Sequence, residues 1–448
     1  KSDDKGNSWQ SISSNLPERG SIYSIEEDHI DPNLIFCGTE FGAFFSPDSG
    51  GSWKELSAGL PTIAVRDIAI QRRENDLILG TFGRGFYVMD DYSVLRSIEN
   101  SDKSLGVKIF DVRDALMWEK ANPLGLPGKA FQGDNFYLAE NLDPVAIFTY
   151  NYNEKFESLK SKRQKAEKKL IKDEKDVSYP TYKELYDEVN EAKPELVFTI
   201  RDNQDNVVKK IYRKPSKGLS RFQWNLRYED NNPINLSSSS FYNPFAGVSE
   251  GTLVNPGTYS IDMSILKAGE TTKVGNAQSF NVVALNNTVM PADDRAAKVN
   301  FQRKVSKLQA EMGEYSRKFS EVTNKIPYID EAIKRVEQPI DEISKMAWDV
   351  KQAIKEVNLN FYGDNVKSRL DIQSNLTPYS RLGSVAYYQK YSTAAPTKTH
   401  MDSYEIAKDE FQPIKLMIDE LRVKMLDLEN RLKEIGAAYT PGRPKPIN

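Results

Sequence analysis

Cysteine and histidine are scarce in this sequence. It holds one cysteine, Cys37, and two histidines, His29 and His400, among 448 residues. One cysteine excludes an internal disulfide and a multi-cysteine zinc site, and its apolar surroundings predict a buried structural thiol. Two histidines so far apart give little support to a histidine-rich metal site or to histidine-dependent catalysis. We therefore expect neither a metal site nor a cofactor.

Long apolar runs and a strong net charge are also lacking. No apolar run approaches the about 20 residues that a membrane-spanning helix needs. The net charge is −3 and the isoelectric point is about 5.8, so the sequence shows no basic footprint for DNA or RNA. Phosphate-binding loops, dinucleotide fingerprints, zinc motifs and Ser-His-Asp strings are absent as well. The proportions of hydrophobic residues (39%) and charged residues (28%) are those of folded domains.

A repeated motif is the strongest positive signal. The pattern Ser-x-Asp-x-Gly-x-x-Trp occurs twice, at Ser2, Asp4, Gly6 and Trp9 and again at Ser46, Asp48, Gly50 and Trp53. The two tryptophans are 44 residues apart, and each is followed by Leu-Pro seven residues later. The motif fits a tight turn between two strands, in which the aspartate accepts backbone N–H bonds and the glycine adopts a positive φ. The tryptophan is expected to pack between blades, and the aspartates are predicted to be structural.

The stretches between the motifs predict short strands at matching positions. Apolar or alternating runs lie at 22–25, 34–38 and 41–45, and again at 65–70, 77–80 and 85–89. A period near 44 residues with about four short strands is the size of a β-propeller blade. Because no motif follows the third unit, we expect residues 1–96 to be the last blades of a propeller. Two blades do not bury a propeller core alone, so the remaining blades are expected upstream of Lys1.

Residues 105–290 carry the pattern of a second β domain. Alternating strands are predicted at 107–112, 135–138, 145–151, 196–201, 207–212, 218–226, 257–266 and 277–284. Turns rich in Asn, Asp and Gly separate them, which favours a β-sandwich of fibronectin-like or immunoglobulin-like type. Trp224 lies in the middle of one strand, between Phe222 and Leu226, and is predicted to be a core residue.

Residues 154–192 interrupt these strands. The segment is rich in Lys and Glu, and its apolar residues mark one helical face, at Phe156, Leu159, Ala166 and Leu170. Pro180 ends this helix and a second apolar face follows. We predict a helical hairpin inserted between two strands, either as a solvated excursion or as a protruding contact arm.

Residues 293–448 predict long helices. Apolar residues recur at alternating spacings of four and three from Phe301 to Val357 and again from Tyr404 to Ile435, where Gly436 ends the helix. We expect a turn at Pro339, which precedes two acidic residues, and a kink at Pro327, or the reverse. We expect an antiparallel, coiled-coil-like helical domain whose apolar stripe serves internal packing, with a partner-binding face as the alternative.

These parts together resemble a bacterial family of large secreted proteins with sortilin-like Asp-box (BNR) repeats, whose members are often named glycosyl hydrolases. The resemblance rests on the string Gly-Thr-Phe-Gly-Arg-Gly-Phe-Tyr-Val-Met-Asp-Asp at 80–91, on Pro-Gly-Thr-Tyr at 256–259 and on Tyr-Thr-Pro-Gly-Arg at 439–443. It implies export to the periplasm or cell surface, with possible outer-membrane association. It also implies a longer parent protein with its main propeller upstream, of which this chain resembles the C-terminal part. It implies no particular reaction, because the family name comes from the repeat.

Two functions are open at this point. A sialidase-like glycoside hydrolase needs clustered arginines, a Tyr–Glu nucleophile pair and an acid. Residues near the blade strands that could contribute are Glu40, Arg66, Arg84, Tyr87, Asp90 and Asp91, of which the last four are the binding candidates. No spacing marks them as a set, and we assign no catalytic residue. The sequence favours the alternative, a non-catalytic surface binding or scaffold protein that holds protein, peptide or glycan partners within a cell-envelope assembly.

Overall fold

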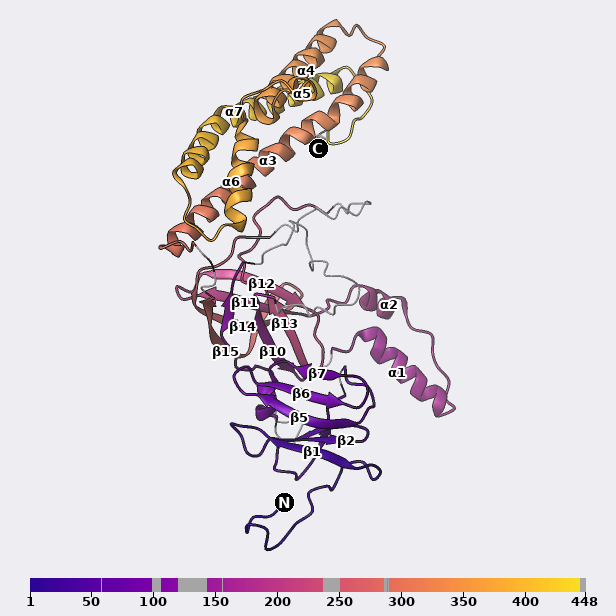
Figure 1. Cartoon of the computed structure of the whole chain (residues 1–448). Helices are drawn as coiled ribbons and strands as arrows, with labels where there is room; N and C mark the ends of the chain where they lie inside the picture. Colours follow the sequence, from indigo (N-terminus) through magenta and orange to yellow (C-terminus); the bar gives the residue numbers. More distant parts are fainter. Residues whose placement is uncertain are drawn as a thin grey trace. The chain divides into compact units, whose positions relative to one another are not determined.

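The structure of the chain is a computed structural model that describes residues 1–57, 59–98, 106–119, 143–154, 156–236, 250–285, 288 and 290–443. It is a mixed β and α protein with several sheets and a C-terminal helical region (Figure 1). Two compact units make up the chain. One comprises Lys1–Asp114, Ala146–Trp224 and Thr258–Asn281, and the other Ala115–Val145, Asn225–Gly257 and Val282–Asn448. The sequence-based domains 1–96, 105–290 and 293–448 have other boundaries and stay a prediction.

Two antiparallel sheets form the N-terminal part of the first unit. Their strand orders are β1-β2-β3-β4 and β5-β6-β7. The strands are β1 (Ile22–Glu27), β2 (Ile35–Thr39), β3 (Gly42–Ser46), β4 (Lys54–Glu55), β5 (Val65–Gln71), β6 (Asp76–Thr81) and β7 (Phe86–Met89). The six strands predicted between residues 22 and 89 are confirmed, and β4 is an addition too short to show a pattern.

The two N-terminal sheets repeat each other in detail. A register shift follows the first residue of β1, and the same shift follows the first residue of β5. In the next hairpins, Thr39 donates its hydroxyl to the carbonyl of Gly42 over 3.0 Å, and Thr81 does the same to Gly85 over 2.7 Å. The sequence repeat is therefore also a structural repeat.

An apolar core lies between these two sheets. Phe36 and Phe45 of the first sheet belong to one buried cluster with Ile68 and Leu79 of the second. The short helix η1 (Tyr92–Ser97) follows β7 and adds Tyr92, whose ring meets that of Phe36 edge to face at 5.1 Å. Burial of each such side chain stabilises the fold by about 1.5–3 kcal/mol.

Two further sheets have the strand orders β13-β10-β8 and β12-β11-β14-β15-β9. Their strands are β8 (Lys108–Ile109), β9 (Ala115–Met117), β10 (Ala146–Tyr152), β11 (Glu195–Asp202), β12 (Val207–Arg213), β13 (Gly218–Trp224), β14 (Gly257–Lys267) and β15 (Glu270–Ala284). Aromatic rings from both sheets meet, since Phe222 lies 4.5 Å from Phe198 between ring centroids. Trp224 is only 1% exposed, which confirms its predicted place in the core.

The predicted strands of this region differ from the observed ones at its start. β8 covers two residues of the predicted 107–112, and the predicted strand 135–138 lies outside the described residues. β9 was not predicted, because three residues are too few to show an alternation. It pairs in parallel with the end of β15, a pairing that only the tertiary structure could select.

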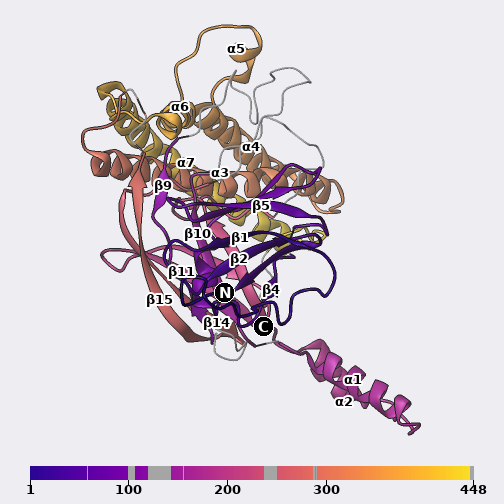
Figure 2. The same cartoon turned by 60° about the horizontal axis from the view of Figure 1, so that its bottom comes forward.

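Two helices lie between β10 and β11, as predicted. They are α1 (Leu159–Lys172) and α2 (Tyr182–Val189), and they lie side by side in both views (Figures 1 and 2). Ser158 caps the first, and Thr181 forms a capping box with Glu184 at the second. Arg163 joins them through hydrogen bonds of 2.5 and 3.0 Å to the carboxylate of Glu188.

The C-terminal region contains the helices α3 (Arg295–Lys334), α4 (Asp341–Tyr362), α5 (Asn365–Arg369), α6 (Pro378–Tyr391) and α7 (Lys398–Glu434). The turn predicted at Pro339 is confirmed, and α3 continues through Pro327. α7 contacts α3, α4 and α6 through its apolar seam, in which Phe411 and Leu421 are fully buried. α5 and α6 were not predicted, because the residues between Gly363 and Thr397 show no long apolar period.

Candidate functional site

Hydrogen bonds to the Asp48 carboxylate hold the second motif turn together. One carboxylate oxygen accepts the backbone N–H of Ser52 at 2.8 Å and the hydroxyl of Ser46 at 2.7 Å, and the other accepts the hydroxyl of Ser52 at 3.1 Å. The Ser46 hydroxyl in turn accepts the N–H of Gly50, which has a φ of +93°. This carboxylate holds its own turn together.

The first motif turn has the same bonds. Asp4 accepts the backbone N–H of Ser8 at 2.8 Å and the Ser2 hydroxyl at 2.8 Å, and Gly6 donates its N–H to Ser2 at 2.7 Å. The bond from the Ser8 backbone, helped by the Ser8 and Ser2 hydroxyls, lowers the pKa of Asp4 to about 2. Asp4 is thus held as a charged acceptor within its turn, and Asp48 accepts the equivalent bonds in the second turn.

The two motif tryptophans differ in burial. Trp53 is 5% exposed and packs with Cys37, Phe44, Ile12 and Leu16, whereas Trp9 is 77% exposed. In this chain the expected packing of the motif tryptophan is seen at Trp53 and not at Trp9. The reason is that the segment around Ile12 covers Trp53, while no segment of the described chain covers Trp9.

Three of the four binding candidates near β7 are engaged in contacts within the fold. Tyr87 packs against the core between the N-terminal sheets. Asp91 caps η1 by accepting the N–H of Ser93, and the carbonyls of Asp90 and Asp91 each accept a 2.9 Å bond from the Arg221 guanidinium.

The remaining candidates, Arg84, Glu40 and Arg66, are not brought together with one another by the described contacts. Arg84 is exposed in a tight turn between two glycines with positive φ. Glu40 is exposed, and Arg66 stacks on the rings of Tyr23 and Phe82, at 3.9 and 5.2 Å from the centroids. The contacts of the described residues give these side chains no shared partner.

A buried ionic cluster that the sequence did not predict lies close to these sheets. The Asp28 carboxylate accepts bonds of 2.7 and 2.8 Å from the Arg96 guanidinium and a 2.5 Å bond from the Tyr92 hydroxyl. Burial alone raises the pKa of this carboxyl, but the Arg96 and Tyr92 bonds outweigh burial and hold the pKa well below its usual range. Its acceptors are thus occupied from within the unit, which suits a structural clamp between the loop after β1 and η1.

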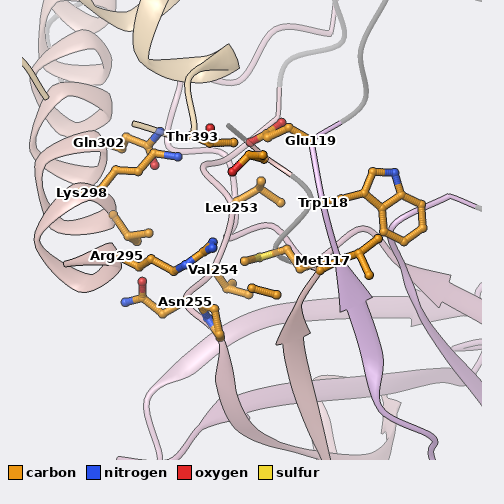
Figure 3. A pocket seen from close by; sticks show the side chains of 15 residues that line it. Met117, Trp118, Glu119, Leu253, Val254, Asn255, Arg295, Lys298, Gln302 and Thr393 are labelled. Carbon is orange, nitrogen blue, oxygen red and sulfur yellow. The ribbon is translucent and has the colours of Figure 1, made fainter. Parts of the chain in front are cut away.

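The strongest candidate for a ligand site is a cavity in the second unit (Figure 3). Its volume is about 40 Å³, which is room for a few water molecules or a small ion. One wall is the first turns of α3, with Arg295, Lys298 and Gln302, and the facing wall carries Glu119 just after β9 (Figure 3). Leu253, Val254, Ala284 and Leu285 give it an apolar floor.

Burial perturbs the two facing charges of this cavity. Burial raises the pKa of Glu119, although the positive charges of Arg227, Lys298 and Lys390 act to lower it. Burial lowers the pKa of Lys298, although the negative charge of Glu119 acts to raise it. Perturbed titratable groups in a cavity are typical of functional sites and also of structural ion pairs. Sequence reasoning did not find these two residues together, because they are far apart along the chain.

An open cleft of about 310 Å³ shares Gln302 with this cavity. Its lining mixes amides, an aromatic ring and charges, including Asn232, Gln309, Tyr387 and Glu250. Glu250 is paired with Arg227 at 3.2 Å. Such a lining offers hydrogen bonds to a polar ligand.

Comparisons with known proteins add no family to these observations. A scan against protein-family models found no match, and a search of curated proteins found no matching relative. Within the described ranges, no group of three His, Cys, Asp or Glu side chains is arranged to hold a metal ion. None of the described helices is long and apolar enough to cross a membrane.

Proposed function

We propose that this chain is a non-catalytic binding or scaffold part of an exported cell-envelope protein, and that it acts by holding protein or glycan partners. In this proposal the two N-terminal sheets are the last blades of an Asp-box propeller whose other blades lie upstream. The two following sheets form a fibronectin-like sandwich, and the C-terminal helices form an antiparallel bundle. The periplasm or the bacterial cell surface is the proposed location.

The α1–α2 hairpin is the observation that carries this proposal. Both helices are described in full, and neither contains a buried residue. The hairpin nevertheless exposes large apolar side chains, with Tyr179 at 88%, Tyr182 at 81% and Val189 at 84%. Exposed apolar groups that form a contiguous patch mark protein–protein interaction sites. Tyrosine is enriched at protein interfaces, so the hairpin suits a contact arm.

The engagement of the candidate catalytic residues supports binding over hydrolysis. A hydrolase of sialidase type needs several titratable side chains converging on one sugar. Here Tyr87 packs in a core and Asp91 caps a helix. These side chains are therefore held by the fold rather than presented together to a substrate.

The proposal is tested by purifying the natural protein from its own cell envelope. One variant carries Tyr179→Ser and Tyr182→Ser, and the matched control carries Tyr439→Ser, another exposed tyrosine at 62%. We expect wild type and control to retain the same partner and the hairpin variant to lose most of it. A photo-crosslinking amino acid in place of Tyr182 should join that partner covalently.

One combination of results would contradict the binding role. If all three proteins elute alone and monomeric and hydrolyse a glycan efficiently, the binding role is wrong. A glycoside hydrolase with its site in upstream blades would then take its place.

A further inference from the structure

The pairing registers relate the two N-terminal sheets residue by residue. Phe36 pairs with Phe45 across β2 and β3, and Ile78 pairs with Val88 at the same place across β6 and β7. The adjacent pairs correspond in the same way, Gly38 with Ala43 and Gly80 with Phe86. Because side chains alternate between the faces of a sheet, these sets lie on equivalent faces.

The equivalent faces differ in burial. On the first sheet, Phe36 is fully buried and Phe45 is 5% exposed, because the second sheet packs over them. On the second sheet, Val88 is 55% exposed and Phe86 is 79% exposed. The β5-β6-β7 sheet (Figure 1) therefore presents, open to solvent, the face that its neighbour buries.

The segments that follow the two motifs pack in the same order along the chain, each on the corresponding face of the next sheet. Leu56 and Leu60, in the segment after the second motif, pack into the core between the two sheets. Ile12 and Leu16, at the same positions after the first motif, pack on the opposite face of the first sheet. Each segment thus lies against the sheet that follows its own motif. Continuing this order requires another sheet on the open face of β5-β6-β7.

We propose that this open face, formed by Ile78, Phe86 and Val88, binds a further Asp-box sheet of the same polypeptide, encoded upstream, and so closes the propeller ring. The inference rests on the proposed propeller and names the surface at which the ring closes. The established contact between the two N-terminal sheets supplies the geometry, since the open face continues it in register. Face-to-face pairing of two β5-β6-β7 sheets from separate copies would not repeat that arrangement.

The test is the reactivity of a thiol placed on this face. Val88→Cys is compared with Tyr212→Cys on β12, a matched control because Tyr212 is 53% exposed against 55% for Val88. The native thiol does not interfere, because Cys37 is buried and burial raises its pKa to about 12. Each variant is made in the present 448-residue chain and in the natural polypeptide with its upstream region.

We expect Val88→Cys to react with a maleimide as fast as the control in the 448-residue chain and at least tenfold more slowly in the longer polypeptide. Tyr212→Cys should react equally in both. Phe86→Glu should lower the melting temperature of the longer polypeptide but not that of the shorter one.

Three results would overturn the inference: equal reactivity of Val88→Cys in both polypeptides, a natural polypeptide without upstream repeats, or protection in the shorter chain together with a dimer in sedimentation. The last would identify a second copy as the occupant. All three leave the binding role open, since that role is tested on the hairpin.

Discussion

The indole N–H of Trp53 donates a 2.6 Å hydrogen bond to the backbone carbonyl of Ile12, 41 residues earlier in the chain. Asn15 completes the link, because its amide side chain bonds both the N–H and the carbonyl of Trp53 at 2.8 Å. The segment after the first motif is thus fixed to the second motif. This relationship makes the repeat cooperative, since the second motif holds the chain that enters its sheet.

Replacement of Trp53 should therefore cost far more stability than replacement of Trp9. We expect Trp53→Ala to lower the free energy of unfolding by about 3–5 kcal/mol, because it opens a cavity and breaks the bond to Ile12. Trp9→Ala should change it by less than about 0.5 kcal/mol, as at other exposed positions. Urea unfolding followed by circular dichroism measures both. Equal losses would show that Trp9 is also covered.

The motif aspartates give a second matched pair. Asp48→Ala should destabilise the chain by about 1–3 kcal/mol, because the Ser52 N–H and the Ser46 hydroxyl lose their acceptor in a part-buried turn. Asp4→Ala should have a smaller effect, since water reaches the first turn. Thermal melting of both variants checks this. Unchanged melting of Asp48→Ala together with abolished partner binding would show that Asp48 contacts a ligand.

The Asp28 cluster should make the free energy of unfolding fall as the pH is lowered. The pKa of Asp28 is depressed in the folded state, so its stabilisation is full above the unfolded value of about 3.9 and is lost as the pH falls toward the folded value. Asp28→Asn leaves the Arg96 charge without its counter-ion and should cost about 3–5 kcal/mol at pH 7. The difference from wild type, measured by urea unfolding, should shrink below about pH 4. A constant difference from pH 7 to pH 2.5 would contradict this role.

The cavity in the second unit contains a pair of charges whose coupling can be measured. Glu119→Gln or Lys298→Gln alone should leave the stability nearly unchanged or raise it, because the raised pKa of Glu119 and the lowered pKa of Lys298 show that the folded state disfavours each charge. The double variant should be more stable than the sum of the two single effects predicts, with a coupling of about 0.5–3 kcal/mol, because each single variant leaves the other charge without its opposite. A double-mutant cycle in urea gives this value. Strict additivity would mean that the two charges do not interact.

The sequence by itself determined the elements that have a local cause. The motif turns follow from Ser, Asp and Gly at fixed spacings, and the same bonds form at Asp4 and Asp48. The long helices follow from their apolar period, and Pro339 and Gly436 mark helix ends because of their own backbone preferences. Short elements escaped prediction, since β9 and α5 contain too few residues to show a period.

Only the tertiary structure decided which of these residues are buried, paired or open. The same motif buries Trp53 and exposes Trp9, because burial depends on which segment packs over the side chain. The pairing of Asp28 with Arg96 joins residues 68 positions apart, and Glu119 faces Lys298 across a cavity built from distant segments. Contacts of this kind are determined by the packing of whole sheets and helices. Desolvation depends on how deeply a group is buried, and Coulomb energy depends on the distance between two charges. Neither burial nor distance in space can be read from a local pattern of residues.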